Sequence, residues 1–176
     1  MELYVARHAE TALNAENRVC GISDDNLTEQ GKLQAEHLAE ELRGVSFGAI
    51  FSSPQKRALQ TAQPIARQCR LSVREELRLA EQNYGIYEGA ARDDPGFLAN
   101  KGNFAFRYPQ GESMMQVAAR VYGLLEELKQ NPPDKAVLLV THGGIFRVLN
   151  SYFEDMTNDA FFHFGMKNCG WKKYEW

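Results

Sequence analysis

Cysteine is scarce in this chain, since only three of its 176 residues, Cys20, Cys69 and Cys169, are cysteines. Their number is odd, they lie far apart and no Cys-x-x-Cys pair occurs, which argues against a disulfide framework and a cysteine-ligated zinc site. A chain of this length buries about 70% of its unfolded surface and folds without such cross-links. The cysteine usage predicts a reducing, cytosolic compartment.

Long apolar runs are also missing. None reaches 18 residues, the length at which a transmembrane helix is expected. The start, residues 1–4, lacks the basic and apolar stretches of a signal peptide. Positive charge is not in excess, because 20 lysines and arginines face 23 aspartates and glutamates, for a net charge of -3. We therefore expect neither a membrane nor a nucleic-acid partner.

Several catalytic and metal-binding motifs are absent. The sequence contains no Gly-x-x-x-x-Gly-Lys-Ser/Thr phosphate loop, no His-Glu-x-x-His zinc motif and no Gly-x-Ser-x-Gly elbow. His8-x-Glu10 matches the start of a zinc deaminase signature, but the Pro-Cys-x-x-Cys half of that signature is missing. We therefore expect a site without a metal and without a cofactor.

What the chain does contain is an alternation of strand-like and helix-like segments. Continuous apolar runs occupy residues 3–6, 49–51 and 136–140, and runs of this length suit strands buried on both faces of a parallel sheet. Helical patterns occupy the segments 35–42, 53 into the sixties, 114–128 and 143–151. We predict an α/β fold with a mostly parallel sheet. With no repeat or linker, residues 1–176 are interpreted as a single domain.

Further local features refine this picture. Ser53-Pro54 is expected to cap and begin the second helix, and Pro64 to interrupt or kink it. Residues 168–176 are expected to add an edge strand, and 143–151 to form the last helix. Residues 89–110 contain glycine, proline and aromatic residues without a clear period. We interpret them as a loop or a short cap.

Each predicted strand runs directly into residues that suit anion chemistry. The first ends at Arg7-His8, the second at Ser52-Ser53 with Arg57 in the next helical turn, and the third at Thr141-His142. Ligands of open parallel sheets bind outside the carboxyl ends of the strands. Arginines, imidazoles and helix N-termini that meet at this edge would hold a dianionic phosphoryl group.

The second predicted helix adds an independent argument. Its first turn carries Lys56 and Arg57, although the dipole of a helix disfavours positive charge at its N-terminus. We interpret Lys56 as a solvated surface residue and Arg57 as part of an anion site. His37 and His163 are expected to lie at the surface or in packing contacts, away from the chemistry.

The motifs around these residues resemble those of the histidine phosphatase superfamily, also called the phosphoglycerate mutase-like family. Residues 7–11, Arg-His-Ala-Glu-Thr, are similar to the family's Arg-His-Gly-Glu-Thr/Ser, with alanine in place of glycine. Further matching blocks follow in the family's order, at residues 27–31, 52–62, 79–81, 85–89 and 140–144. The resemblance covers nearly the whole chain and implies a three-layer sandwich around a mostly parallel central sheet, as in phosphoglycerate mutase.

The resemblance implies roles for the matched residues. His8 is the nucleophile that becomes a phosphohistidine, and the positive charges of Arg7 and Arg57 favour its neutral form. Glu81 protonates the leaving oxygen and then activates water. The groups expected to bind the phosphoryl oxygens are Arg7, Asn14, Arg57, His142 and the backbone N–H of Gly143.

Two other glutamates, Glu10 and Glu88, lie within matched blocks. We interpret both as ordinary surface glutamates, because surface exposure is usual for this residue type.

The resemblance leaves hydrolase and mutase open. A mutase must retain its product and exclude water, and residues 89–110 offer little chain for such a cap. We therefore predict a phosphomonoester hydrolase that acts on a small phosphorylated metabolite, as a monomer or homodimer. The side chains expected to line the pocket, and to favour a substrate with an apolar or anionic tail, are those of Phe104, Phe106, Arg107 and Tyr108.

Three alternatives remain. Residues 18–21, Arg-Val-Cys-Gly, look like the mutase loop that holds a substrate carboxylate, which makes Cys20 and Gly21 candidate binding residues and keeps a phosphoglycerate mutase as the first alternative. The others are a phosphoprotein phosphatase and a phosphate-binding module without catalysis.

Overall fold

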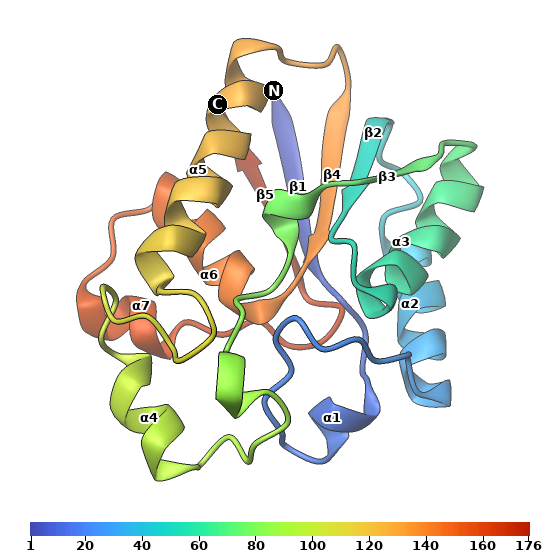
Figure 1. Ribbon diagram of the computed structural model, residues 1–176. Helices are drawn as coiled ribbons and strands as arrows, with labels where there is room; N and C mark the ends of the chain where they lie inside the picture. The colour runs from blue at the N-terminus through green and yellow to red at the C-terminus, as the bar shows by residue number, and fades with distance from the viewer.

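Five strands form one sheet in the order β3-β2-β4-β1-β5 (Figure 1). The computed structural model describes all residues, 1–176. Four strands run parallel, and β5 pairs antiparallel with β1 at one edge. The strands are β1 Glu2–Arg7, β2 Phe47–Ser52, β3 Val73–Glu75, β4 Ala136–Thr141 and β5 Trp171–Glu175. The predicted α/β fold with a mostly parallel sheet and an added edge strand is therefore confirmed.

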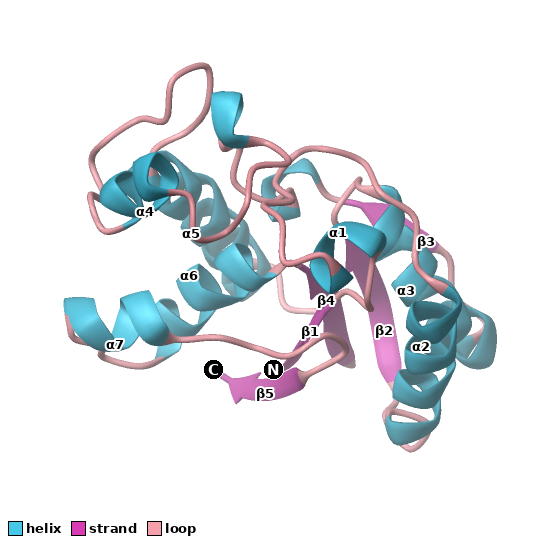
Figure 2. Ribbon diagram, turned by 90° about the horizontal axis from the view of Figure 1, so that it is seen from below, coloured by secondary structure: helices cyan, strands magenta, loops and turns pink.

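Helices cover both faces of this sheet. Figure 2 shows α2 and α3 on one side and α5 and α6 on the other, which gives three layers. The helices are α1 Ala12–Ala15, α2 Glu29–Glu41, α3 Lys56–Cys69, α4 Pro95–Lys101, α5 Met114–Gln130, α6 Gly143–Phe153 and α7 Asn158–His163. None of them combines the length and the apolar composition that crossing a bilayer requires.

The central strand β4 shows why the sheet is buried on both faces. Val137 and Leu139 pack into the core cluster on the α5 and α6 side, while Leu138 and Val140 pack into the cluster on the α2 and α3 side. Successive side chains of a strand point to opposite faces, so a continuous apolar run fills two cores at once. The strand thereby fixes the position of the residue that follows it, His142.

The start of α3 differs from the prediction. The helix begins at Lys56 with Gln55 as its N-cap, so Ser53-Pro54 neither caps nor begins it. The N–H of Ser53 continues the strand pairing by donating to the Val140 carbonyl at 2.9 Å. Its hydroxyl lies 2.6 Å from Nε2 of His142. The serine therefore belongs to the site rather than to the helix.

Pro64 does not end α3, which continues to Cys69. The proline removes one backbone donor, but it is buried together with Ile65 and Ala66 on the apolar face of the helix. We infer that burial of this face outweighs the lost hydrogen bond.

Three short helices, α1, α4 and α7, lie where none was predicted from the sequence. Residues 89–110 contain α4, which Asp94 caps by accepting from the N–H of Phe97. The helix that begins at Gly143 is not the last one, because α7 follows it. Lys101, the last residue of α4, lies 5.1 Å from the centre of the Phe162 ring of α7, and Figure 1 shows both helices in the lower part of the molecule, where the parallel strands end. Both therefore lie near the carboxyl ends of the strands.

Candidate active site

His8 follows β1 directly and is buried. Its Nδ1 lies 2.7 Å from the Ala9 carbonyl oxygen. Because a carbonyl can only accept, Nδ1 carries the proton and Nε2 keeps its lone pair. Burial holds the pKa of His8 well below its usual value of 6.5, and the positive charges of Arg57 and Arg7 lower it further. The residue is thus a neutral imidazole with one unprotonated nitrogen.

Arg57 lies in the first turn of α3 and is completely buried. Its guanidinium donates to the carbonyls of Gly21 and Ser23, both at 2.6 Å. Its Nε donates to Nδ1 of His142 at 3.2 Å. No carboxylate forms an ion pair with it, so neutral acceptors fix the side chain while its charge remains uncompensated.

His142 follows β4 and caps α6 with its backbone alone. Since its Nδ1 accepts from Arg57, its Nε2 carries the proton and donates to Ser53 Oγ at 2.6 Å. The pKa of His142 lies well below its usual value because of burial first, and then because of Arg57 and His8. The rings of His8 and His142 are 5.0 Å apart. Both histidines are therefore neutral, with opposite tautomers.

Arg7, the last residue of β1, donates through Nη1 to the Met166 carbonyl. Its Nε is buried and has no hydrogen-bond partner. A Cβ on Gly143 would lie 3.7 Å from this atom, so the unpaired donor faces the N-terminus of α6. Burial, followed by the charge of Arg92, lowers the pKa of Arg7. An anion at this place would satisfy the unpaired donor.

Glu81 is the one carboxylate in the site, and it is buried. Its two oxygens accept from the backbone N–H groups of Gln82, at 2.9 Å, and Gly144, at 3.0 Å. Two fixed backbone donors therefore set the orientation of a group that can give and take a proton.

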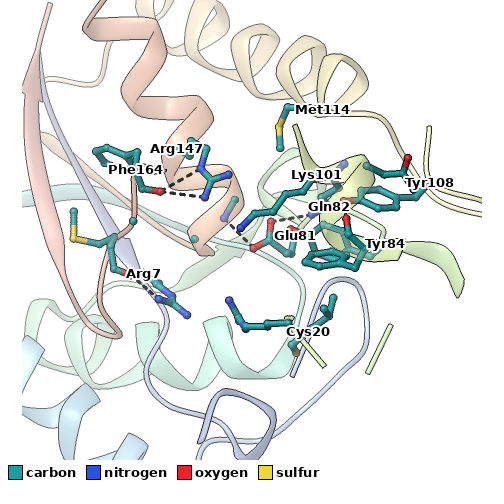
Figure 3. Close-up of a pocket in the computed structure, with 18 of the residues that line it drawn as sticks. Arg7, Cys20, Glu81, Gln82, Tyr84, Lys101, Tyr108, Met114, Arg147 and Phe164 are labelled. Carbon is teal, nitrogen blue, oxygen red and sulfur yellow. Dashed lines mark hydrogen bonds between the residues drawn. The ribbon is translucent and has the colours of Figure 1, made fainter. Parts of the chain in front are cut away.

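Arg7, His8 and Glu81 line a cavity of about 150 Å³. That is smaller than the roughly 300–1,000 Å³ of sites that enclose drug-sized ligands, so it suits a small molecule. Figure 3 shows Arg7, Cys20, Glu81, Lys101 and Arg147 around this space. The lining residues that were predicted as site residues are Arg7, His8, Asn14, Cys20, Glu81 and Gly143.

Three predicted site residues lie outside the lining. Arg57 and His142 are fully buried, do not line the cavity and contact each other. Gly21 does not line the cavity, and a Cβ on it would come 2.1 Å from Oε1 of Glu88. Its carbonyl holds Arg57, which gives Gly21 a supporting position.

Asn14 keeps a free donor at the cavity. Its Oδ1 accepts from the N–H of Thr11 and from Nδ2 of Asn168, which leaves its own Nδ2 for a ligand. Cys20 also lines the cavity, and burial raises the pKa of its thiol. The thiol is therefore held in its neutral form.

The expected loop for a substrate carboxylate has a different arrangement. Arg18 is exposed, donates to the Gly89 carbonyl at 2.6 Å and pairs with Glu16 at 3.6 Å. It does not line the cavity, whereas its neighbours Val19 and Cys20 do. This arginine is therefore not placed to hold a substrate group.

Glu88 is not the ordinary surface glutamate that the sequence suggested. Its carboxylate accepts from the backbone N–H groups of Gly21, Ile22, Ser23 and Tyr84 and from the Ser23 hydroxyl. These bonds fix the loop whose carbonyls hold Arg57. In the sequence, only its place in the matched Gly-Ile-Tyr-Glu-Gly block could have indicated this supporting role of Glu88. Glu10 accepts from the hydroxyl of Thr28.

Lys56, His37 and His163 are exposed, as predicted, and Lys56 lies 3.4 Å from Asp24. Among residues 104–108, Phe106 and Tyr108 line the cavity, and Phe104 packs against Phe161 instead.

The cavity lining also includes Arg92, Lys101 and Arg147, which no motif of the sequence indicated. Arg92 and Lys101 come from the aperiodic segment, which carried no positional signal. Arg147 lies one helical turn after Gly143 and therefore faces the same strand end. No three histidine, cysteine, aspartate or glutamate side chains are grouped so that they could hold a metal ion.

Comparison with known proteins agrees with this geometry. A family model described as histidine phosphatase superfamily (branch 1) matches residues 3–176. The chain is 34% identical to a curated relative from Cronobacter sakazakii named "Probable phosphoglycerate mutase GpmB", over 96% of this chain and 82% of the relative.

Solved structures are also similar to this chain. The mycobacterial glucosyl-3-phosphoglycerate phosphatase has a TM-score of 0.87 and 30% identity, over 98% of this chain and 88% of that one. The alpha-ribazole phosphatase from Shigella flexneri has a TM-score of 0.86 and 26% identity, over 98% and 89%.

Proposed function

This chain belongs to the histidine phosphatase superfamily, and from that premise we propose that it hydrolyses small phosphomonoesters through a phosphohistidine on His8, without a metal ion. The observation that carries the proposal is the tautomer of His8. Its Nδ1–H is bonded to the Ala9 carbonyl, and the residue lines the cavity. An unprotonated Nε2 is therefore available to attack phosphorus.

The first half-reaction transfers the phosphoryl group to His8. Arg7, the N–H of Gly143 and Nδ2 of Asn14 bind the phosphoryl oxygens, while the buried positive charge of Arg57 keeps the pKa of His8 low. A bond forms between Nε2 and phosphorus, and the ester P–O bond breaks. Glu81 gives its proton to the leaving oxygen. Such transfer depends mostly on positioning and on stabilising charge.

The second half-reaction returns the enzyme to its starting state. Glu81, now a carboxylate, takes a proton from water as the water oxygen attacks phosphorus. The N–P bond breaks, inorganic phosphate leaves and His8 is again neutral. Glu81 is the only carboxylate among the lining residues, so the same group serves both steps.

Hydrolysis is favoured over mutase activity by the position of Arg18. A mutase retains its phosphorylated product during reorientation, but the arginine of the mutase-like loop donates to the Gly89 carbonyl and does not line the cavity. Residues 89–110 contribute a single seven-residue helix. The similarity to two phosphatases supports the same choice. The curated relatives named as mutases make phosphoglycerate mutase the second candidate.

The direct test is phosphate release from p-nitrophenyl phosphate after thorough chelation with EDTA. We expect turnover by the wild type, no turnover by His8→Ala and normal turnover by His37→Ala, which changes an exposed histidine. Absence of any turnover would leave a phosphate-binding module, and full dependence on added metal would refute the metal-free chemistry.

A second assay separates hydrolase from mutase. With 3-phosphoglycerate, we expect phosphate release to exceed formation of 2-phosphoglycerate. Isomerisation that outpaces phosphate release would identify a mutase.

The cytosolic location and the monomeric or homodimeric state remain predictions. Light scattering on the purified protein checks the second.

A further inference from the structure

Positive charge is concentrated in the cavity. Four cationic side chains line it, from Arg7, Arg92, Lys101 and Arg147, against the single carboxylate of Glu81. The protein as a whole carries a net charge of -3. The charge of the cavity lining is therefore opposite in sign to the net charge of the protein. Arg7 binds the phosphoryl group that reacts, whereas the other three cationic side chains have no role in that chemistry.

Carbonyl groups fix two of these three side chains. Arg147 donates to the Phe164 carbonyl through Nε and Nη2, at 3.2 and 3.1 Å, as Figure 3 shows. Arg92 donates through Nε to the Arg18 carbonyl at 3.0 Å. No carboxylate forms an ion pair with Arg92 or Arg147. The arginines that form ion pairs in this structure are others. The charge of Arg92 and Arg147 is thus positioned but not compensated.

Aromatic rings of α7 orient two of the three cations. The guanidinium of Arg147 lies 5.7 Å from the centre of the Phe161 ring, and Nζ of Lys101 lies 5.1 Å from the centre of the Phe162 ring. Such contacts attract a cation to the ring face without cancelling its charge. Adjacent residues of one short helix therefore hold cations that come from α4 and α6.

The phosphoryl end of the site is constructed in the same way. There too, carbonyl oxygens rather than carboxylates hold the arginines, from Met166 for Arg7 and from Gly21 and Ser23 for Arg57. Burying a charge without a counter-charge costs free energy. Burial lowers the pKa of both Arg147 and Lys101, and for Lys101 the neighbouring charges of Arg147 and Arg92 lower it further. A bound anion would relieve this cost.

We propose that Arg92, Lys101 and Arg147 form a second anion subsite, so that the substrate carries a further anionic group, a carboxylate or a second phosphate, besides the phosphate that reacts. This inference rests on the proposed function, because it names the class of phosphomonoester that the same cavity takes. It assigns the recognition of the second group to α6 and to residues 89–110.

Matched substrate pairs test the proposal. The first pair is glycerol 3-phosphate and 3-phosphoglycerate, which differ by a hydroxymethyl group in place of a carboxylate. The second pair is fructose 6-phosphate and fructose 1,6-bisphosphate. We expect kcat/KM for at least one anionic member to exceed that of its partner about 10- to 100-fold, as for hydrogen bonds to charged groups. The pair that shows the difference tells carboxylate from phosphate.

Variants that remove one positive charge show which side chains cause the preference for the anionic substrate. Arg147→Gln and Lys101→Gln should each reduce the ratio of kcat/KM between the preferred pair about tenfold. Arg92→Gln should reduce it less, because Arg92 is exposed and exposed charges are screened. Arg147→Lys should retain part of the preference. Lys129→Gln removes an exposed charge of α5 outside the cavity, and should leave the ratio unchanged.

The outcomes separate the two proposals. Equal kcat/KM within both pairs, or a preference that survives in the Arg147→Gln and Lys101→Gln double variant, would overturn the second subsite while the phosphatase activity stands. Absence of hydrolysis with every substrate, p-nitrophenyl phosphate included, would refute the proposed function itself.

Discussion

His8 and His142 carry their single proton on different ring nitrogens, and their neighbours decide which. The carbonyl of Ala9 requires a proton on Nδ1 of His8, and the guanidinium of Arg57 requires a bare Nδ1 on His142. The sequence predicts that Arg7, His8, Arg57 and His142 lie near one another, because each follows the end of a predicted strand. It could not give the tautomers, because these depend on atoms that come from distant parts of the chain.

Both histidines make stability depend on pH. Burial keeps the pKa of each well below 6.5 in the folded protein, whereas the unfolded chain titrates near 6.5. Below that pH the unfolded state binds more protons, so the free energy of unfolding falls as the pH falls toward the folded pKa. We expect a loss of up to about 1.4 kcal/mol per pH unit for each histidine.

Urea denaturation at several pH values between 7.5 and 5 measures this slope. His142→Gln should remove about half of the histidine contribution, and His37→Gln, at an exposed position, should remove none. If His142→Gln had the same slope as the wild type, the burial of a neutral His142 would be refuted.

At the scale of elements, the loop of residues 20–23 is the support of the site. Glu88 accepts five hydrogen bonds, four of them from this loop, and the loop holds Arg57. Glu88→Ala leaves these donors without their acceptor, at a cost of about 2 kcal/mol or more. Because Arg57 then loses its fixed position, we expect kcat/KM to fall roughly 10- to 100-fold.

If Glu88 positions the catalytic groups, the fall in kcat/KM of Glu88→Ala should come mainly from a lower kcat. Glu88→Gln keeps one acceptor oxygen and should recover part of the activity, and Glu16→Ala, at an exposed site, is the matched control. Full activity of Glu88→Ala at a temperature where it is folded would contradict the positioning role.

The backbone at Gly85 lies very close to the backbone at Pro109, near the end of the segment 89–110. Gly85 has a φ of +56°, and a Cβ on it would lie 1.8 Å from the Pro109 carbonyl oxygen. Gly85→Ala should therefore destabilise the protein by about 2–4 kcal/mol. Gly123, in α5, has nothing within 4 Å of a Cβ, so Gly123→Ala should stabilise by about 0.5–1 kcal/mol. Thermal unfolding of both variants checks the opposite signs, and equal shifts would be inconsistent with this contact.

At the scale of the whole molecule, the long elements could be predicted from the sequence and the short ones could not. The apolar run at 136–140 and the stripe at 114–128 were clear because their side chains fill the two cores. The strand β3 has three residues, two of them exposed, and α1 and α7 bury none of their residues. No periodic pattern of apolar residues therefore marks these elements in the sequence.

The order of the strands also lies beyond local pattern. β4 pairs with both β1 and β2, which depends on crossovers that no single segment specifies. In the same way, Lys101 and Arg147 line one cavity although they come from different helices, α4 and α6. The matched motifs indicated the phosphoryl end of the cavity, while the end with the additional cations became visible only in three dimensions.

The central claim is that His8 carries the phosphoryl group, and trapping it is the most direct measurement. In Glu81→Ala, water attack on phosphohistidine loses its general base, which typically contributes about 10²–10⁴-fold. A good leaving group such as p-nitrophenolate hardly needs protonation, so the first step should partly survive and the intermediate should accumulate.

Rapid quench of Glu81→Ala with radiolabelled p-nitrophenyl phosphate should therefore trap a phosphoenzyme that is labile in acid and stable in base. The label should be absent from the His8→Ala, Glu81→Ala double variant. A label that persists without His8, or that is stable in acid as a phosphoserine is, would contradict the account.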